Sequence, residues 1–199
     1  LHAGPDANAG IEKTIEIIPV KGDSFKIVHT LRNCNRWDVE LAAWGITVMA
    51  PGGKAIIPMP QGDPEALLPN TFISLWPYVT LSDGRIRFGS KYTLVQQDSK
   101  CGPAKMGCNC EDGWIAYQNK GITFIKKYEH FVDAEYPDNG CSVELYTNGE
   151  MLEAETLAPL YAISEGEEIV HVEEWLCTAG PKKIDTEKEA AKYLPVPQV

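Results

Sequence analysis

The sequence lacks three features that would each point to a class of protein. It has no run of about 18 apolar residues, which excludes a transmembrane helix and leaves no reason to expect a membrane partner. Its 18 Lys and Arg against 28 Asp and Glu give a net charge of −10, which argues against a nucleic-acid partner. The first ten residues lack the basic and apolar stretches of a signal peptide, so we expect a cytoplasmic location.

Metal-binding patterns are also scarce. Cys108 and Cys110 form one C-x-C pair without a nearby histidine, whereas structural metal sites usually combine two C-x₂₋₄-C pairs or add histidines. The even number of six cysteines permits disulfides, but a domain of this size does not require them. We therefore expect ordinary reduced or buried thiols, no metal and no cofactor.

Short alternating runs separated by turn residues dominate the chain and predict an all-β fold. Residues 11–33 and 113–132 read as hairpins, the second around Asn119-Lys120-Gly121. Residues 38–50 are apolar with little alternation, which predicts one strand buried on both faces. Residues 59–70 form a loop that is long enough to border a site.

Only the C-terminal tail has helical signals. Thr186 and Glu189 form a capping box, and Pro195 ends the predicted short helix. We therefore divide the chain into one β-sandwich domain, residues 1–179, and a tail with a short helix, residues 180–199.

Residues 141–157 predict the central hairpin. Asn148-Gly149 suits a two-residue type I′ turn, which would place Glu144 opposite Glu153. Because side chains alternate along a strand, one face is apolar and the other polar. The polar face carries Ser142, Glu144, Tyr146, Met151, Glu153 and Glu155.

The carboxylates on that polar face allow two interpretations. Like charges on neighbouring strands are destabilising, so solvent, a cation or a raised pKa must offset their repulsion. A solvated face that only keeps the protein soluble is one reading. The other is a carboxylate cluster in a cleft, suited to proton transfer or to binding sugar hydroxyls.

Several segments resemble the galactose-mutarotase-like superfamily, and in particular an uncharacterised branch of it. The segments that carry the resemblance, in family order, are 29–33, 37–53, 68–70, 75–78, 140–148, 152–159 and 166–175. The resemblance implies an antiparallel β-supersandwich that binds or modifies carbohydrate. It also implies that family members carry several N-terminal strands before the segment that matches Ile11, so we expect this chain to be truncated at its N-terminus.

The resemblance further implies site residues. The general base of mutarotases matches Glu155, and we expect Glu144 to tune the pKa of Glu155 by repulsion. The family's first catalytic histidine falls at Trp44, and no histidine occurs between His29 and His130. Epimerase activity would thus need another proton donor, for which Lys105 or a tyrosine could substitute.

Four further residues are candidates for substrate binding: Glu153, Lys105, Trp44 and Trp76. Tryptophan rings can stack on sugars but more often belong to the core, and Trp114 carries the same two readings. Lys105 could pair with the acids or be an ordinary surface lysine.

Three histidines have plainer interpretations. His29 alternates with apolar residues, which predicts a hydrogen-bonded core histidine, whereas His130 and His171 lie in strands near acids, which favours solvated side chains.

Three functions remain open at this stage. The first is sugar modification with epimerase-like acid–base chemistry at Glu155 and Glu144. The second is a non-catalytic sugar-binding module, and the third is a structural or assembly domain without a ligand. An exposed sheet edge would in addition favour a homo-oligomer.

Overall fold

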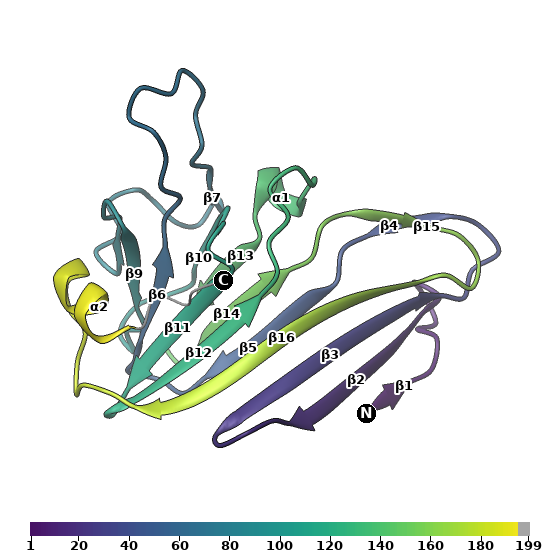
Figure 1. Cartoon of the computed structure of the whole chain (residues 1–199), viewed down its shortest axis with the longest axis horizontal. Coiled ribbons are helices and arrows are strands. Elements are labelled where there is room, and N and C mark those ends of the chain that lie inside the picture. The colour runs from purple at the N-terminus through teal and green to yellow at the C-terminus, as the bar shows by residue number, and fades with distance from the viewer. Residues whose placement is uncertain (195–199) are drawn as a thin grey trace.

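Two antiparallel sheets pack face to face in this protein (Figure 1). The computed structural model describes residues 1–194. Within that part of the chain, no helix is both long and apolar enough to cross a membrane. The predicted all-β architecture is confirmed.

The larger sheet has nine strands, and it runs from the N-terminal strands at one edge to the side covered by the C-terminal helix at the other (Figure 1). Its strands, in spatial order, are β1 (His2–Ala3), β2 (Ile11–Pro19), β3 (Ser24–Asn33), β16 (Glu168–Ala179), β12 (Ile122–Tyr128), β11 (Trp114–Asn119), β6 (Lys54–Pro58), β9 (Tyr92–Gln96) and β8 (Ile86–Arg87). Both predicted hairpins, β2–β3 and β11–β12, belong to this sheet. The β11–β12 turn is the two-residue Lys120-Gly121, with both residues at positive φ.

The smaller sheet has five strands and carries most of the site described below. In spatial order these are β5 (Trp44–Met49), β14 (Leu152–Leu157), β13 (Val143–Thr147), β10 (Ala104–Cys108) and β7 (Ile73–Leu75). A separate pair consists of β4 (Val39–Leu41) and β15 (Tyr161–Ile163). Two of the five strands, β5 and β7, form the sheet's edges.

The main core fills the space between the two sheets. Alternate residues of the smaller sheet point into it, among them Met106, Val143, Leu145, Leu152 and Ala154. Because strand side chains alternate, the remaining residues of these strands must point to the opposite face. We call that opposite face the outer face of the five-stranded sheet.

A short C-terminal helix covers the other side of the larger sheet. Helix α2 (Glu187–Tyr193) begins at Thr186 with both hydrogen bonds of the predicted capping box. Its Ala190 and the nearby Leu194 pack with Ile184 against Trp114 of β11. Trp114 is 1% exposed, so it is a core residue and does not stack on a ligand.

The central hairpin forms, but the predicted register was wrong by two residues. Thr147 pairs with Leu152, and Glu144 therefore faces Glu155 and not Glu153. The Asn148 side chain accepts hydrogen bonds from the backbone N–H groups of Glu150 and Met151, which closes a four-residue loop. A shift of two preserves the face of every side chain, so the predicted division into an apolar and a polar face holds.

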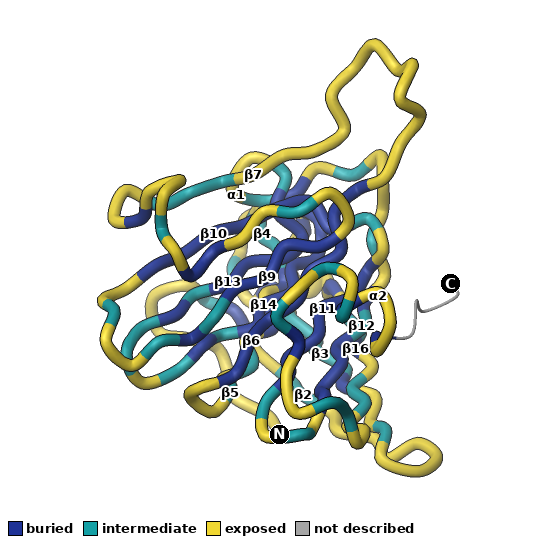
Figure 2. The backbone as a smooth tube through the Cα atoms, turned by 90° about the vertical axis from the view of Figure 1, so that its left-hand side faces the viewer, coloured by how far each residue is buried: buried dark blue, intermediate teal, exposed yellow. Residues whose placement is uncertain are grey.

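Two other predictions need correction. Residues 38–50 form two strands and not one, and β5 lies at a sheet edge with Ile46 and Val48 exposed on the outer face. Strand β10 lies inside the Cys- and Gly-rich segment that showed no strand pattern. The predicted loop after β6 does project from the body, and it is exposed from residue 61 to residue 70, whereas Met59 and Pro60 are buried (Figure 2).

The turn before the central hairpin has an unusual backbone. Helix α1 (Pro137–Gly140) contains two residues with left-handed φ, Asp138 at 51° and Asn139 at 65°. Left-handed φ is uncommon outside glycine, although Asp and Asn tolerate it better than other residues. The turn lies beside β7, where Ser74 Oγ donates a hydrogen bond to the backbone oxygen of Asp138.

Candidate functional site

Five side chains meet on the outer face of the five-stranded sheet, around the ammonium group of Lys105. Lys105 Nζ lies 2.6 Å from Glu144 Oε2 and 3.2 Å from Glu155 Oε2. It also lies 4.5 Å from the ring centroid of Trp44 and 4.6 Å from that of Trp76. We call Lys105, Glu144, Glu155, Trp44 and Trp76 the Lys105 cluster.

Strand register brings these residues together. Glu144 on β13 faces Glu155 on β14, and Trp44 on β5 faces Leu157, two residues farther along β14. Lys105 on β10 pairs with Tyr146, two residues from Glu144. These pairs place both carboxylates and the ammonium group on one face, as the alternation of the central hairpin predicted.

A glycine makes room for Glu144 in this sheet. Gly107 pairs with Glu144 across β10 and β13. A Cβ atom at position 107 would lie 2.5 Å from Cys141 Sγ and 3.1 Å from Glu144 Cγ. The missing side chain therefore allows Glu144 to lie against β10 beside Lys105.

Both carboxylates of the cluster are removed from solvent. Glu144 and Glu155 are 0% exposed, because Lys105 and the two tryptophans cover them. Burial raises the pKa of Glu144 to about 7, although the ammonium group of Lys105 opposes the shift. Burial also raises the pKa of Glu155, against the opposing effects of Lys105 and of the hydrogen bond from Trp44.

The ammonium group of Lys105 stays charged. Burial by itself lowers the pKa of Lys105, but the two adjacent carboxylates outweigh that effect and raise it. Trp44 Nε1 donates a 2.8 Å hydrogen bond to Glu155 Oε2, so one carboxylate oxygen of Glu155 has two partners. The other, Oε1, is buried and has no hydrogen-bond partner within residues 1–194.

Aromatic side chains border the cluster toward solvent. Trp44 is 49% exposed and Tyr78 is 50% exposed, while Trp76 is half-buried. Partial burial raises the pKa of Tyr78, which follows Trp76 by two residues, and the charges of Lys105, Glu155 and Glu144 also act on it. The accessible part of the site is therefore aromatic, and the charged groups lie beneath it.

The structure thus brings together five of the six residues predicted for a site. The sixth, Glu153, is half-buried on the same face, opposite Tyr146, and its charge raises the pKa of Glu155. Sequence reasoning assigned Asp138 to a turn, yet its side chain also raises the pKa of Glu144. The opposed carboxylates Glu144 and Glu155 are fully buried and not solvated, whereas Glu153 on the same face is partly exposed.

Sequence reasoning missed a second charged cluster, which lies between the two sheets. Glu173 on β16 and Lys126 on β12 are each 0% exposed, and their side chains form an ion pair of 2.7 Å. Lys126 Nζ also donates to the backbone oxygens of Gly45 and Ala154. The sequence signal for this cluster is the alternation along β16. Every second residue after the apolar Ile169 is His171 and then Glu173, so these two side chains point to the same face as Ile169.

Glu173 is the most extensively paired acid of the interior. Its carboxylate accepts hydrogen bonds from Thr156 Oγ1 at 2.5 Å and from Trp175 Nε1 at 2.8 Å, and His29 Nε2 lies 3.3 Å away. Burial alone raises the pKa of Glu173, but His29, Lys126 and Thr156 together lower it well below its usual value. The Glu173 carboxylate is therefore a charged structural group at any pH near neutrality.

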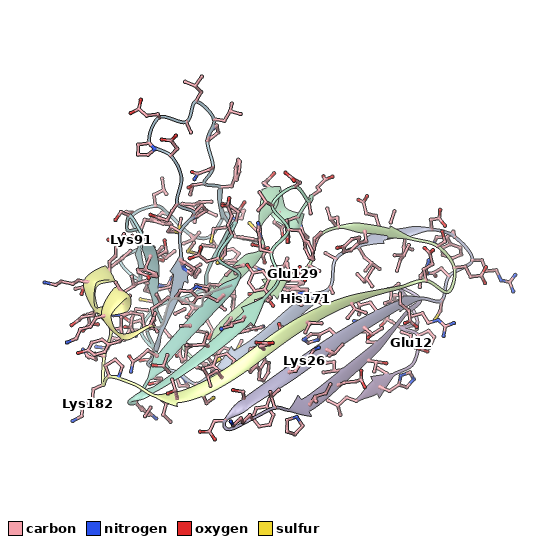
Figure 3. The ribbon with its side chains drawn as sticks, viewed as in Figure 1. Glu12, Lys26, Lys91, Glu129, His171 and Lys182 are labelled. Atoms are coloured by element: carbon pink, nitrogen blue, oxygen red, sulfur yellow. The ribbon has the colours of Figure 1, made fainter. Side chains whose placement is uncertain are left out.

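The histidines differ from their predicted environments. His171, in the middle of β16 (Figure 3), is 5% exposed and not solvated; its Nε2 lies 2.9 Å from Thr156 Oγ1. Burial lowers the pKa of His171 to about 4. His130 is half-buried and stacks on Tyr136 with ring centroids 4.9 Å apart. His29 faces the interior, as its apolar alternation predicted, but it is only half-buried and its Nε2 has no hydrogen-bond partner among residues 1–194.

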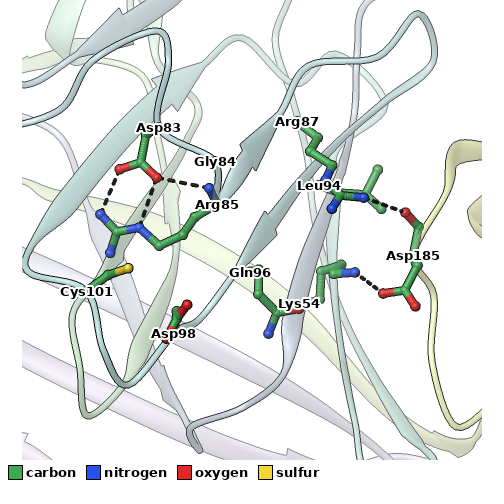
Figure 4. A pocket seen from close by; sticks show the side chains of 10 residues that line it. All are labelled: Lys54, Asp83, Gly84, Arg85, Arg87, Leu94, Gln96, Asp98, Cys101 and Asp185. Atoms are coloured by element: carbon green, nitrogen blue, oxygen red, sulfur yellow. Dashed lines mark hydrogen bonds and ion pairs between the residues drawn. The ribbon is translucent and has the colours of Figure 1, made fainter.

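A separate cavity of about 280 Å³ lies on the side of the larger sheet near α2 (Figure 4). Its charges are largely neutralised within the cavity. Asp83 holds Arg85 through two carboxylate oxygens, and Asp185 pairs with Lys54. None of the four surface cavities described for residues 1–194 is lined by a residue of the Lys105 cluster.

The six cysteines are free thiols, three of them buried. Burial raises the pKa of Cys110 to about 12 and that of Cys141 to about 11, which makes both thiols unreactive near neutral pH. In the described part of the chain, no group of three or more His, Cys, Asp or Glu side chains has a geometry that could hold a metal ion.

Comparison with known proteins gives matches in structure only. No family model and no curated protein matches the sequence. The solved structures that it matches include two proteins described as candidate aldose 1-epimerases, one from Escherichia coli K12 (TM-score 0.57, 9% identity, 86% of this chain) and one from Klebsiella pneumoniae (TM-score 0.54, 10% identity, 89% of this chain). A galactose mutarotase-like protein from Lactobacillus casei matches with a TM-score of 0.50 and 10% identity over 89% of this chain.

These matches show a galactose mutarotase-like fold. At 9–10% identity they say nothing about which reaction, if any, the chain performs. The chain spans 61% of the Escherichia coli protein, 49% of the Klebsiella protein and 68% of the Lactobacillus protein.

Proposed function

We propose that this chain, which has the galactose mutarotase-like fold, binds carbohydrate over the Lys105 cluster. The observation that carries the proposal is the gathering of Trp44, Trp76 and Tyr78 around a buried ion-pair centre. Two of the structural neighbours are described as aldose 1-epimerases, which supports an aldose as the ligand.

The chemistry of the site fits a sugar. The apolar CH face of a sugar ring packs on an aromatic face, and its hydroxyl groups both donate and accept hydrogen bonds. Trp44 and Tyr78 offer half-exposed rings, and Trp44 contacts both Lys105 and Glu155. A binding site of this kind needs no group to change its protonation state.

Replacing Trp44 by alanine is expected to weaken sugar binding about tenfold, which corresponds to about 1.4 kcal/mol. The loss follows because the ring supplies both contact area and the hydrogen bond that orients Glu155. Isothermal titration with a panel of aldoses measures the effect. Trp37→Ala is the matched control, because Trp37 is 65% exposed in a different part of the chain. Equal affinities of both variants, or no binding of any sugar by the unaltered protein, would refute the proposal and favour a structural or assembly domain.

Acid–base chemistry of the epimerase kind is the second candidate. Glu144, with a pKa of about 7, lies directly opposite Glu155, and a general acid or base works best with a pKa near the working pH. In this reading Glu155 abstracts a proton and Glu144 tunes it by repulsion. Proton transfer requires a carboxylate to touch the sugar, so Lys105 would have to move, and it also requires a second proton donor, because Trp44 stands where the family's first catalytic histidine would fall. Binding requires no proton donor and is therefore the better supported function.

The same titrations separate the two candidates when they are followed by NMR, which reports the exchange of sugar anomers. Acceleration of that exchange, abolished in Glu155→Gln, would establish the enzyme. Ligand binding without acceleration would leave only the binding module.

We also propose that the chain self-associates through the exposed edge strand β5. The edge offers unpaired backbone groups to a further strand, and Ile46 and Val48 are 48% and 60% exposed beside it. Val48→Lys is expected to lower the average mass found by light scattering at high protein concentration, since a lysine opposes edge pairing. Val170→Lys is the control, because Val170 is 54% exposed on a central strand. A monomer at all concentrations would disprove self-association.

A further inference from the structure

The Lys105 cluster is built around a cation. Two tryptophan rings lie within 5 Å of the ammonium nitrogen, and two carboxylates lie within hydrogen-bond distance on its other side. Tryptophan faces attract Lys, Arg and ligand cations through the ring quadrupole, and cages of aromatic rings recognise quaternary ammonium ligands. In this structure the cation is the protein's own lysine.

The charges of the site do not balance. Lys105 supplies the positive charge of the cluster. Four acids, Glu144, Glu155, Glu153 and Asp138, shift the pKa of Lys105 or of one another. The whole chain is also acidic, with a net charge of −10. An anionic sugar, such as a uronate or a sugar phosphate, would meet repulsion here, and a neutral sugar would leave the excess of negative charge uncompensated.

Two carboxylate oxygens show that the site has unused hydrogen-bonding capacity. Glu155 Oε1 and Glu144 Oε1 are buried and unpartnered among the described residues, while Oε2 of Glu155 has two donors. Buried carboxylate oxygens are normally paired, so an unpaired one calls for a donor. An ammonium group is all donor, with three N–H bonds and no acceptor.

We propose that the ligand is an amino sugar, an aldose that carries a free protonated amine. This inference rests on the proposed carbohydrate function and specifies the ligand class. The ammonium group of the sugar takes the place of the Lys105 ammonium between Trp44 and Trp76 and donates to Glu155. Lys105 swings outward on its flexible four-carbon stem, and the sugar ring packs on the exposed faces of Trp44 and Tyr78.

Three probes on the full chain test this inference: glucosamine, N-acetylglucosamine and methylammonium. Tryptophan fluorescence reports occupancy, since two rings line the site. We expect glucosamine to bind the unaltered protein at least tenfold more tightly than N-acetylglucosamine, which has a similar ring without the charge. The preference should disappear at a pH high enough to deprotonate the amine.

The variant Lys105→Ala gives a second test, because it removes the protein's own cation from the site. In Lys105→Ala, glucosamine should bind about tenfold more tightly than in the unaltered protein, and methylammonium should raise the melting temperature. Lys100→Ala, which removes an exposed lysine from the loop before β10, should change neither quantity. If Lys105→Ala does not fold, the comparison of glucosamine with N-acetylglucosamine in the unaltered protein decides by itself.

The outcomes separate this inference from the proposed function. Equal binding of glucosamine and N-acetylglucosamine overturns the amino-sugar assignment and leaves carbohydrate binding in place. If methylammonium binds and no sugar binds, the carbohydrate function is overturned. The ligand would then be a cation that is not a sugar. Absence of binding by all three probes overturns the amino-sugar assignment, and it overturns the carbohydrate function as well if no sugar of the aldose panel binds.

Discussion

Glu173→Ala is expected to lower the free energy of unfolding by about 3–5 kcal/mol, because it leaves the buried ammonium group of Lys126 without its counter-charge. Lys126 and Glu173 are both 0% exposed, and their 2.7 Å ion pair joins β12 to β16 in the interior. Thr156 and Trp175 would also lose an acceptor. Domains are typically stable by only about 5–15 kcal/mol, so this variant should be largely unfolded at moderate urea concentrations.

Urea unfolding followed by circular dichroism measures this loss. Glu174→Ala is the matched control, because Glu174 is the next residue of β16 and points to solvent; its effect should stay within about 0.5 kcal/mol. The double variant Lys126→Met with Glu173→Leu should recover most of the stability, since well-packed apolar residues can replace a buried ion pair. If the single and double variants were equally unstable, the loss would come from packing and not from an uncompensated charge.

The all-β fold and the grouping of Glu144 and Glu155 on one face of a sheet could both be predicted from the sequence. The central hairpin shows why a wrong register did not change this grouping. The predicted turn at Asn148-Gly149 was wrong, because the Asn148 side chain closes a longer loop by accepting two backbone N–H groups. Local sequence does not decide between these two loops. The error shifted the register by two residues, and since side chains repeat every two residues, Glu144 and Glu155 stayed on one face.

Other features depend on tertiary contacts that local patterns do not encode. Strand β10, Ala104–Cys108, contains Gly107 and has no regular alternation, yet it pairs on both sides and places Lys105 in the site. On β16 His171, for which a solvated side chain was predicted, points inward together with Glu173, whereas Val170 is 54% exposed. Polar groups lie inside there because Lys126, on the neighbouring strand, supplies the opposite charge.

Two buried groups with opposite pKa shifts give the second large prediction. Burial lowers the pKa of His171 from 6.5 to about 4 and raises that of Glu144 from 4.5 to about 7. Between about pH 4.5 and 6.5, the unfolded chain holds a proton on His171 that the folded chain lacks. Over the same range, the folded chain holds a proton on Glu144 that the unfolded chain lacks. The first difference makes stability fall on acidification, and the second makes it rise.

Each proton changes the free energy of unfolding by about 1.4 kcal/mol per pH unit, so the two effects nearly cancel in the unaltered protein. Glu144→Gln should therefore unmask a loss of stability of about 2–3 kcal/mol between pH 6.5 and pH 4.5. His171→Asn should unmask a gain of similar size over the same range. Urea unfolding at a series of pH values measures both slopes, which do not depend on how much each substitution destabilises the protein overall. Parallel pH profiles for the two variants would show that these groups do not titrate differently in the folded and unfolded chains. That result would contradict the burial of Glu144 in the Lys105 cluster and of His171 beside Glu173.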